Sequence, residues 1–479
     1  MTDPTMPEVP AVPQIPGNDW SLLVPDPDAT WTPHRLVSIC IPTRNPGPGL
    51  ARTLRCLGAQ TYPTDLIEVV IADDGSDHPI AVPDGLAHTV RVVRQERTLG
   101  FGAGRARNLA GFAAEGDILF FLDADVIPER QVVESYARWF EGSDLAVPLG
   151  LCRFVDVDDL DDDALVDLVR SGGMATHFEG LDVDDQTWRE RHFARLHDLQ
   201  VESIDAFRVT IGATLAVSAA MFAEVGGFPE LGVRGVEDTA FGYRVHNDGG
   251  ILILDRDAVH WHQGRRNLST NRRQEIDRVR APYVESVIPV RGFRRGAPPA
   301  DPPVPPVPIA RVHVAGDSPE AQVTRRSVQA DTSGNVALAE DAPGAREGFD
   351  AYDDAFLQVV LPAGAGWGDG TVDLVLDLFA HHDVGVVRAV DDDGSVTDVV
   401  RTRALRRAVH DCPDDDPVEA AARLFGVWWV DVSALDIASR VAPTSDEVEP
   451  DEAPWWRRRQ RLDLWFFDGC EALLRRAAR

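Results

Sequence analysis

The stretch ILFFLDAD, from Ile118 to Asp125, constrains the fold of this chain more than any other. Five consecutive apolar residues are typical of a strand that is buried on both faces, as in a parallel sheet covered by helices. Asp123 and Asp125 follow directly, at the edge of the sheet where open α/β folds bind ligands. Two carboxylates that flank one small residue can hold a hard divalent cation, although aspartates also end strands as turn residues. The neighbouring segments therefore decide whether these two aspartates form a cation-binding site or only a turn.

Periodicity in those segments predicts an alternation of strands and helices. Helices are expected over 50–57 and 106–113, after Pro128 and from Glu237 onward. Strands are expected at 36–42, at 67–76, where the strand ends in paired acids and a turn, and at 90–93, 145–150, 209–218 and 251–255. A strand followed by a helix and a second strand implies a right-handed crossover and a parallel sheet. The acidic segment 155–205 lacks the glycine and closing glutamate of an EF-hand loop, so we interpret it as a solvated helical excursion that covers the site.

Composition narrows the class of protein. The 479 residues carry 47 basic side chains, all of them arginine, against 78 acidic ones, and the net charge of -31 argues against nucleic acid as a partner. The five cysteines are scattered without CxxC spacing, which indicates neither a disulfide framework nor a zinc site. Because no signal peptide and no apolar run of about 20 residues is recognisable, we expect a cytoplasmic protein.

The chain divides into five predicted regions. A proline-rich flexible arm, 1–31, precedes an α/β domain over 32–293. The proline-dense spacer RRGAPPADPPVPPVPI, 294–309, is the clearest domain boundary. Beyond it we expect a second, smaller α/β domain over 310–445 and a C-terminal segment over 446–479.

Aromatic residues suggest how both ends of the chain are held. Trp20 and Trp31 are expected to anchor the N-terminal arm to the first domain. The tail from Trp455 to Arg479 alternates Trp, Phe and Leu with Arg, which predicts a basic amphipathic helix. Such a helix either lies on the inner face of an anionic membrane or packs onto its own domain or a partner subunit.

The second predicted domain repeats a pattern of the first. FLQVVLPAGAG, 356–366, resembles ILFFLDAD, and VDLVLDLF, 372–379, resembles the segment after Pro128. Pro362 and Gly364 stand where the first copy has its two aspartates, so a second copy could not hold a metal in the same way. Two explanations of this pattern stay open. The second domain is a degenerate copy of the first, or the two domains are unrelated α/β segments that share the order of a strand followed by a helix.

Taken together, the motifs of the first domain resemble a known family. In order along the chain stand IPTRN at 41–45, IADDGS at 71–76, DAD at 123–125, GVEDTAFGYR at 235–244 and AVHWHQG at 258–264. This set is similar to family 2 glycosyltransferases of the GT-A fold, whose sheet is Rossmann-like and mostly parallel. The acidic motif resembles that of chondroitin-polymerase-like and galactosyltransferase-like enzymes. The loop GFGAGRARN at 100–108 has Arg105 in place of the third glycine of GxGxxG, which argues against a dehydrogenase.

The resemblance implies which residues bind the donor nucleotide: Pro42, Thr43, Asn45, Asp74, Arg105, Arg107 and Asp123. Asp74 is expected to accept a hydrogen bond from the uracil ring, because a carboxylate is an acceptor and the ring imide is a donor. Arg44 stands where an aromatic residue is common in the family, so the contact with the base differs there.

The resemblance also implies a metal site formed by Asp123, Asp125 and His262. In related transferases a histidine just before a glutamine completes this site, whereas we interpret His260 as a ring packed behind the strand. Imidazole together with carboxylates and phosphate oxygens suits Mn2+ or Mg2+, and the histidine favours Mn2+.

For catalysis, the resemblance assigns Asp238 as the base that accepts the proton of the acceptor hydroxyl and Glu237 as the residue that positions the acceptor. The reverse assignment stays open. A base is needed because a sugar hydroxyl is a poor nucleophile until its proton begins to leave. Acidic residues are also favoured at a helix N-terminus by the helix dipole, and the two explanations are compatible.

The leading hypothesis is a metal-dependent inverting glycosyltransferase of the hexosyltransferase type. It would move a sugar from a nucleotide-diphosphate donor, a UDP-sugar by resemblance, to a hydroxyl of a glycan, lipid-linked or other acceptor in glycan or cell-envelope polysaccharide biosynthesis. The rival is a non-catalytic sugar-nucleotide- or glycan-binding scaffold that recruits a partner, because fold alone does not imply catalysis. The intact DAD, ED and HQG motifs favour the enzyme.

Overall fold

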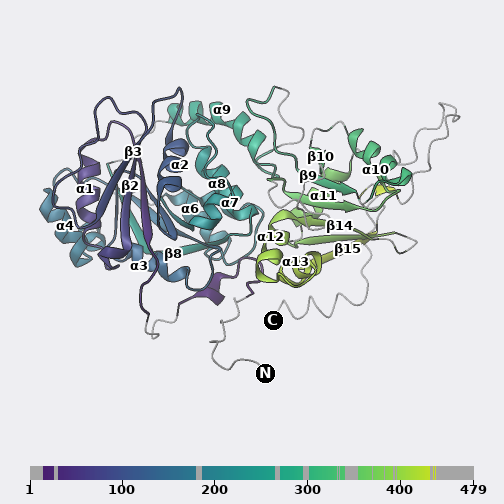
Figure 1. Ribbon diagram of the computed structural model, residues 1–479, viewed down its shortest axis with the longest axis horizontal. Coiled ribbons are helices and arrows are strands. Elements are labelled where there is room, and N and C mark those ends of the chain that lie inside the picture. Colours follow the sequence, from purple (N-terminus) through teal and green to yellow (C-terminus); the bar gives the residue numbers. More distant parts are fainter. Residues whose placement is uncertain are drawn as a thin grey trace. The chain divides into compact units, whose positions relative to one another are not determined.

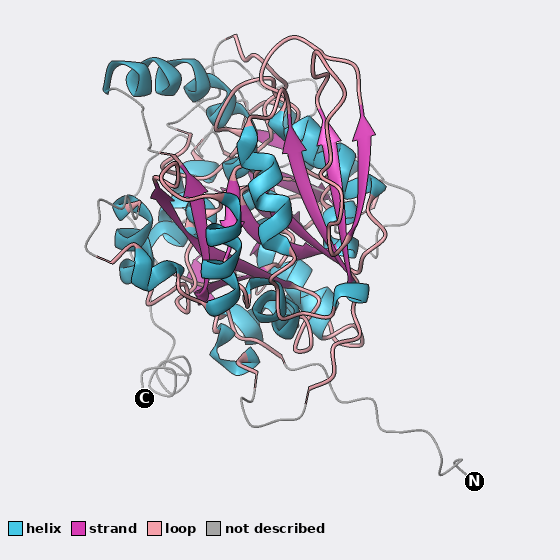
Figure 2. Cartoon of the chain, turned by 90° about the vertical axis from the view of Figure 1, so that its left-hand side faces the viewer, coloured by secondary structure: helices cyan, strands magenta, loops and turns pink. Residues whose placement is uncertain are grey.

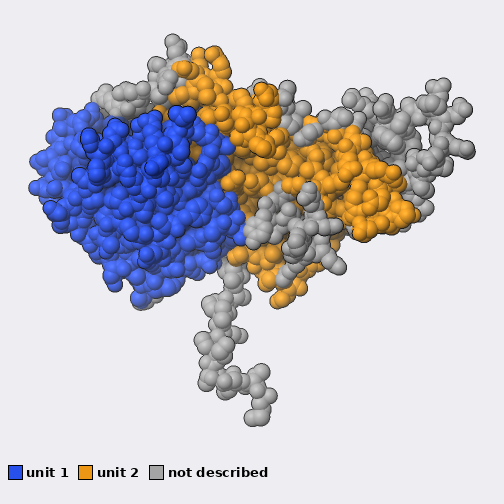
Figure 3. Space-filling view, turned by 45° about the horizontal axis from the view of Figure 1, so that its top comes forward, with its two compact units in different colours: residues 1–202, 209–232, 250–268 blue, residues 203–208, 233–249, 269–479 orange. Residues whose placement is uncertain are grey.

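The computed structural model describes residues 14–25, 31–179, 186–264, 270–294, 301–339 and 354–438, with short gaps in the last two ranges at 315, 332, 334, 369, 382, 392–393, 395, 432–434 and 436. Two compact units divide the chain between them (Figure 3). The first comprises 1–202, 209–232 and 250–268, and the second comprises 203–208, 233–249 and 269–479. The predicted C-terminal amphipathic helix lies outside the described residues.

A mixed sheet of eight strands, in the order β3-β2-β1-β4-β7-β6-β8-β5, forms the centre of the first unit (Figure 1). The first four strands of this order run parallel, and β6 is parallel to β8, whereas β7 is antiparallel to both its neighbours and β5 to β8. All five residues of β4 are buried, as its unbroken apolar run predicts. The strands are β1 (Val37–Thr43), β2 (Ile67–Asp73), β3 (Thr89–Arg94), β4 (Ile118–Leu122), β5 (Val126–Pro128), β6 (Ala146–Val155), β7 (Thr214–Ser218) and β8 (Ile251–Gln263).

Helices cover these strands (Figure 2). Helix α2 lies against β1, β2 and β3, and α3 lies against β6 and β8. The acidic segment after β6 forms three short helices, as expected. The helices are α1 (Pro48–Leu57), α2 (Ala103–Ala113), α3 (Val132–Trp139), α4 (Asp162–Ser171), α5 (Met174–His177), α6 (Thr187–Arg195) and α7 (Ala219–Glu224), with 3-10 turns η1 (Trp20–Leu23) and η2 (Thr64–Leu66).

Two local predictions for the first unit were wrong. Pro128 does not begin a helix but ends β5, and the helix after it begins at Val132. Because β5 is an edge strand of the sheet, a residue without a backbone N–H is tolerated there. The last strand does not stop at Asp255 but continues to Gln263, with a shift of register opposite Gly150 and Leu151.

The N-terminal arm is attached to the first unit where the structure describes it. The buried side chain of Asn18 donates to the carbonyl of Leu252 at 2.8 Å and accepts from the amide of the same residue at 3.0 Å. Trp20 packs edge-on against Trp139, with ring centroids 5.7 Å apart. The ring of Trp31 lies 6.0 Å from that of Tyr62. Both predicted tryptophan anchors therefore contact the first unit.

The second unit has its own mixed sheet of six strands, in the order β10-β9-β11-β14-β13-β15, and a two-stranded sheet of β12 and β16. The predicted α/β class is therefore confirmed for both units. Its strands are β9 (Ala310–Val314), β10 (Val336–Leu338), β11 (Leu357–Leu361), β12 (Gly366–Trp367), β13 (Val386–Val390), β14 (Val396–Arg401), β15 (Val427–Asp431) and β16 (Ile437–Ala438). Its helices are α8 (Glu237–Asn247), α9 (Thr270–Val287), α10 (Pro319–Gln329), α11 (Thr371–His381), α12 (Thr402–Asp411) and α13 (Pro417–Phe425), and the 3-10 turn η3 (Ala206–Val209) begins in this unit.

The described part of the chain holds four cysteines, and each is buried and forms no disulfide. In the same part, no helix combines the length and the apolar character that a bilayer span requires.

Candidate functional site

The carboxyl ends of β1, β2 and β4 lie side by side because these strands are parallel neighbours. Thr43, the last residue of β1, pairs with Asp73, the last residue of β2. Asp73 is buried and holds the turn after β2, since its carboxylate accepts from the Ser76 amide at 2.8 Å and from Arg94 at 2.7 Å. The next residue, Asp74, is therefore presented at the edge of the sheet.

Asp74 is enclosed by the segment that leads into α2. Its Oδ1 accepts from Gln95 Nε2 at 2.9 Å and from the guanidinium of Arg105. Its Oδ2 faces Gly102, where a Cβ atom would lie only 1.8 Å from that oxygen. The glycine-containing loop that the sequence singled out therefore makes room for this carboxylate, and Arg105 neutralises it.

Asn45 connects the loops that follow β1 and β2. Its backbone adopts a left-handed conformation with φ of 47°, and its amide donates to Ser76 Oγ at 2.8 Å. The Asn45 side chain donates to Asp77 at 3.0 Å and accepts from the Asp77 amide at 2.8 Å. Pro42, Thr43 and Asn45 therefore lie on the strand end and loop next to Asp74.

Asp123, directly after β4, is paired with Arg107 of α2. The guanidinium of Arg107 donates to Asp123 Oδ1 at 2.8 Å and lies over the ring of Phe228, 5.3 Å from its centroid. The Arg107 side chain is only 4% exposed, whereas that of Asp123 is 32% exposed. A buried cation is thus held against a carboxylate that solvent and ligands can reach.

Asp125 faces His262 near the end of β8. Asp125 Oδ1 and His262 Nε2 are 3.6 Å apart, too far for a hydrogen bond. The His262 ring is stacked on Phe154, with centroids 4.4 Å apart, and this contact fixes the plane of the imidazole. Burial raises the pKa of Asp125, while the neighbouring His262 opposes the rise and Asp123 adds to it.

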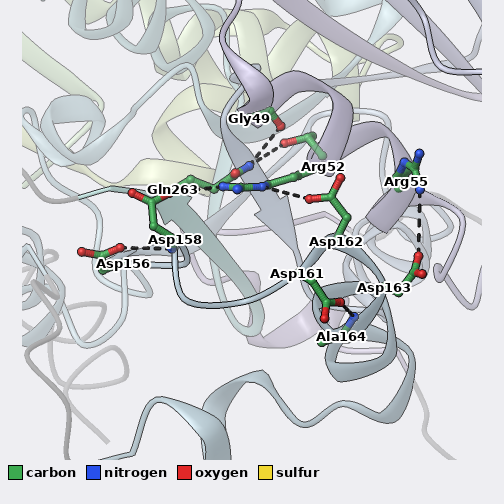
Figure 4. Close-up of polar contacts among 11 residues, drawn as sticks. Gly49, Arg52, Arg55, Asp156, Asp158, Asp161, Asp162, Asp163, Ala164 and Gln263 are labelled. Atoms are coloured by element: carbon green, nitrogen blue, oxygen red, sulfur yellow. Dashed lines mark hydrogen bonds and ion pairs between the residues drawn. The ribbon is translucent and has the colours of Figure 1, made fainter.

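The sequence analysis did not foresee how the end of β8 is held in place. Gln263 Nε2 donates to the carbonyl of Gly49 and to Thr53 Oγ1, each at 3.1 Å (Figure 4). Gly49 also lies against Asp125, since a Cβ there would be 3.2 Å from the Cβ of Asp125. The sequence feature that could have indicated this contact is Gln263 of the HQG motif.

An acidic segment lies beside the same helix α1. Arg52 donates to Asp162 at 3.1 Å and pairs with Asp158 at 3.4 Å. Figure 4 shows Asp163 turned toward Arg55 of the same helix, whereas Asp161 accepts from the amide of Ala164 in its own segment. The side chain of Asp158 is 85% exposed, so this pair adds little stability. The excursion after β6 therefore packs beside α1 through α4.

His260 is not part of the site. It is fully buried between the rings of Phe120 and Tyr136, with centroids 5.7 and 5.8 Å away, and its Nδ1 lies 3.3 Å from the carbonyl oxygen of Leu151. Burial lowers the pKa of His260 to about 3, so the ring is neutral at physiological pH. This is the packed ring that the sequence analysis favoured.

The second acidic pair begins helix α8, which belongs to the second compact unit. Glu237 is buried, and its Oε2 accepts from the amide of Gly235 at 2.8 Å. Asp238 is the next residue of the first helical turn. The predicted position of both carboxylates at a helix N-terminus is therefore observed.

The described residues do not form a ready-made cluster of three metal-ligating side chains. Asp125 and His262 face each other, but Asp123 is occupied by Arg107. The ligand set of Asp123, Asp125 and His262 remains a prediction from the sequence.

Comparison with known proteins relates the first unit to a family. The model of the family described as Glycosyl transferase family 2 matches residues 38–177. The chondroitin synthase of Escherichia coli is 29% identical over 242 residues, which cover 47% of this chain and 34% of that protein. A validoxylamine A glucosyltransferase of Streptomyces hygroscopicus subsp. jinggangensis is 31% identical over 238 residues, which cover 47% of this chain and 54% of that protein. The chain thus spans between a third and about half of the length of these relatives.

Similar solved structures include a mannosyltransferase of Pyrobaculum calidifontis in complex with GDP-Man and Mn2+. The likeness covers 58% of this chain and 68% of that one, at 20% identity and a TM-score of 0.36. Residues 1–349 of Staphylococcus aureus TarS in complex with UDP-GlcNAc give the same identity and TM-score, with 53% and 67% covered. Residues 38–177 thus match the model of glycosyl transferase family 2, and the curated glycosyltransferases are similar to this chain over about half of its length.

Proposed function

We propose that this chain is a metal-dependent inverting glycosyltransferase that moves a sugar from a nucleotide-diphosphate donor to a hydroxyl acceptor. The observation that carries the proposal is the alignment of polar side chains along the carboxyl ends of adjacent parallel strands: Asp74 after β2, Asp123 after β4 and Asn45 after β1. Ligands of α/β sheets bind at such an edge. The match of residues 38–177 to the family model supports the reaction class, and the donor is proposed to be a UDP-sugar.

In this proposal the loops after β1 and β2 bind the nucleoside. Asp74 accepts a hydrogen bond from the base, and Arg105, held beside it, contributes positive charge toward the phosphates. Arg107 is rigidly placed by burial and by its contact with Phe228, so its charge lies beside the diphosphate without a loss of side-chain freedom on binding. Pro42, Thr43 and Asn45 shape the nucleoside pocket.

The side chains near Asp125 fit a divalent cation. Two ligands bonded to one cation at about 2.1 Å lie roughly 3 to 4 Å apart, and Asp125 Oδ1 and His262 Nε2 are separated by 3.6 Å. Asp123, Asp125 and His262 would hold the cation, and the mixture of carboxylate and imidazole favours Mn2+ over Mg2+. When bound, the cation neutralises the charge that develops on the departing nucleoside diphosphate.

The acceptor hydroxyl is proposed to be activated by the acidic pair that begins α8. Asp238 takes the proton, and Glu237, anchored by the Gly235 amide, positions the acceptor. Displacement by a hydroxyl that approaches opposite the leaving group inverts the anomeric centre. The acceptor is a glycan, a lipid-linked glycan or another hydroxyl compound, and the tail 446–479 is a candidate for peripheral membrane contact.

Thermal-shift measurements with UDP, GDP and dTDP, each with and without Mn2+, test the proposal on the wild type and on Asp123→Ala. Binding to the folded state stabilises it by mass action, by about 2.7 kcal/mol when the free nucleotide exceeds Kd a hundredfold. This stabilisation raises the melting temperature. We expect a shift with UDP that requires both Mn2+ and Asp123. No shift with any nucleotide, or an equal shift in Asp123→Ala, would refute the assignment of the donor site.

A further inference from the structure

The sheet of the second unit has the strand order of the first. Six strands of the first sheet stand in the order β2-β1-β4-β7-β6-β8, and those of the second in the order β10-β9-β11-β14-β13-β15. In both, the strands follow the chain in the same sequence. Each of the five neighbouring pairs also has the same direction in the two sheets, parallel or antiparallel. Two unrelated α/β segments would not share order, connectivity and direction throughout.

The register of the central strands is repeated as well. Ile118, the first residue of β4, lies opposite Val37 of β1 and Ser218 of β7. Leu357, the first residue of β11, lies opposite Ala310 of β9 and Arg401 of β14. Each of these residues occupies the same place in its element, and Ser218 and Arg401 both immediately precede the next helix, α7 or α12.

Single backbone hydrogen bonds repeat around this core. In the first unit the Ala219 amide donates to the carbonyl of Asp117 at 2.9 Å, and in the second the Thr402 amide donates to that of Phe356 at 3.0 Å. Both donors begin the helix after the antiparallel strand, and both acceptors precede the central strand. The repeat therefore extends to the connections between elements.

The turn that carries the aspartates in the first unit has the same backbone in the second. Val126 donates to the carbonyl of Asp123 at 3.1 Å, and Ala365 donates to that of Pro362 at 3.1 Å. A short strand follows each turn and pairs antiparallel with a late strand, β5 with β8 and β12 with β16. Pro362 thus occupies the position of Asp123, and Gly364 that of Asp125.

The polar groups of this second turn are satisfied by its own unit. The Gly364 amide donates to Thr324 Oγ1 of α10 at 2.9 Å, and the Trp367 indole donates to Asp331 at 3.0 Å. A proline and a glycine at the two key positions supply neither a carboxylate for a cation nor a charge for Arg to balance. The backbone hydrogen bond of the turn is thus present in both units, whereas the two carboxylates of the first unit are absent from the second.

Helix α12 of the second unit holds the C-terminal end of α8. Arg403 Nη1 donates to the carbonyl of His246 at 2.8 Å, and Arg407 Nε donates to that of Gly249 at 2.8 Å. Both arginines are buried, and their guanidinium groups lie 5.6 and 6.0 Å from the ring centroid of Phe425 on α13. His246 belongs to the last turn of α8, whose carbonyls carry partial negative charge, and Gly249 lies two residues beyond the helix, so the buried cations stabilise this end of α8 and the turn after it.

Side chains of α8 also bind the second unit. Tyr243 Oη donates to the carbonyl of Asp354 at 2.6 Å, and Asn247 Nδ2 donates to that of Ala355 at 3.1 Å. Both acceptors lie just before β11, the strand that corresponds to β4. The helix that begins with the acidic pair is thus held over its C-terminal half by elements of the second unit.

We propose that the second unit is a copy of the transferase fold that has lost its donor-site carboxylates and that serves to hold α8, the helix that carries Glu237 and Asp238. The part that concerns α8 rests on the proposed function. Arg403 and Arg407 are positioning residues in this account, since they act on the acidic pair through the helix. The chain then has one donor site, in the first unit.

The test uses the full chain and compares Arg407→Met and Arg407→Lys with Arg423→Met. Arg423 is an arginine of the same unit whose side chain is 49% exposed and pairs with Asp415, so its replacement removes the same charge without touching α8. Three quantities are measured: the stoichiometry and Kd of UDP in the presence of Mn2+, kcat for Mn2+-dependent hydrolysis of UDP-glucose, and amide hydrogen exchange over 237–247.

We expect one UDP per chain, and none in Asp123→Ala. Arg407→Met should keep the Kd within twofold while kcat falls at least tenfold and exchange over 237–247 accelerates at least tenfold. Arg407→Lys should recover part of kcat, and Arg423→Met should match the wild type in all three. A loss of folded chain alone would lower stoichiometry and rate in proportion, which separates it from a positioning effect.

Each contrary result has a distinct meaning. Two UDP sites per chain would overturn the degenerate copy, because the second unit would then be competent. Unchanged kcat or unchanged exchange in Arg407→Met would overturn the role in holding α8. A wild-type chain that binds no nucleotide would refute the proposed function itself, and the role of α8 with it.

Discussion

Replacing Gly102 by alanine tests the donor site through a single steric contact. Gly102 has φ of -100°, a conformation open to alanine, so the substitution adds a methyl group without backbone strain. That methyl carbon would lie 1.8 Å from Asp74 Oδ2, and ordinary contact begins at 3.4 Å, so the carboxylate has to move by about 1.6 Å.

A movement of this size separates Asp74 from Gln95 Nε2, now 2.9 Å away, and from Arg105. A hydrogen bond to a charged group contributes about 1.5 to 3 kcal/mol. If the same carboxylate binds the base of the donor, its displacement should raise the Kd for UDP roughly 10- to 150-fold, since each 1.4 kcal/mol corresponds to a factor of ten.

Isothermal titration of UDP in the presence of Mn2+ measures this Kd for the wild type, Gly102→Ala and Asp74→Asn. Gly47→Ala is the matched control, because a Cβ at Gly47 would meet no atom within 4 Å. We expect Gly102→Ala and Asp74→Asn to weaken binding alike and Gly47→Ala to leave it unchanged. A Kd for Gly102→Ala within twofold of the wild type, in a folded chain, would refute the assignment of Asp74 to the nucleotide.

Two further predictions concern buried histidines. Burial, reinforced by Arg403, lowers the pKa of His246 well below 6.5 in the folded chain, so the unfolded chain binds more protons as the pH falls below 6.5. The free energy of unfolding of the second unit should therefore decrease as the pH is lowered, by up to about 1.4 kcal/mol per pH unit for this one group. Urea denaturation between pH 7 and 5 measures this slope, and His246→Gln should flatten it. An unchanged slope would contradict the role of His246. Gly150→Ala would place a Cβ 2.4 Å from His260 Cε1, and this overpacking should lower the free energy of unfolding by about 1 to 3 kcal/mol. Urea denaturation of Gly150→Ala against the unhindered Gly47→Ala checks this, and equal stabilities would show that the His260 pocket adapts.

Much of the first unit was predictable because its signals are local. A run such as ILFFL is buried wherever it pairs, and the spacing of leucines in α1 needs only a sheet to cover. The two exceptions were positions where pairing overrode local preference. Pro128 was expected to begin a helix, but an open edge of the sheet accepted it as a strand residue.

The sequence by itself determined the α/β class, the acidic residues at the ends of β2 and β4, and the helix that begins at Glu237. It did so because burial and periodicity are properties of a few consecutive residues. Only the tertiary structure decided the partners of those residues: Arg105 for Asp74, Arg107 for Asp123 and Arg403 for the end of α8. These contacts join residues between 16 and 157 positions apart, and the register that brings them together is set by strand pairing across the whole sheet. For the same reason the repeated pattern around Pro362 was open to two interpretations in the sequence, whereas strand order and register in the second sheet distinguish between them.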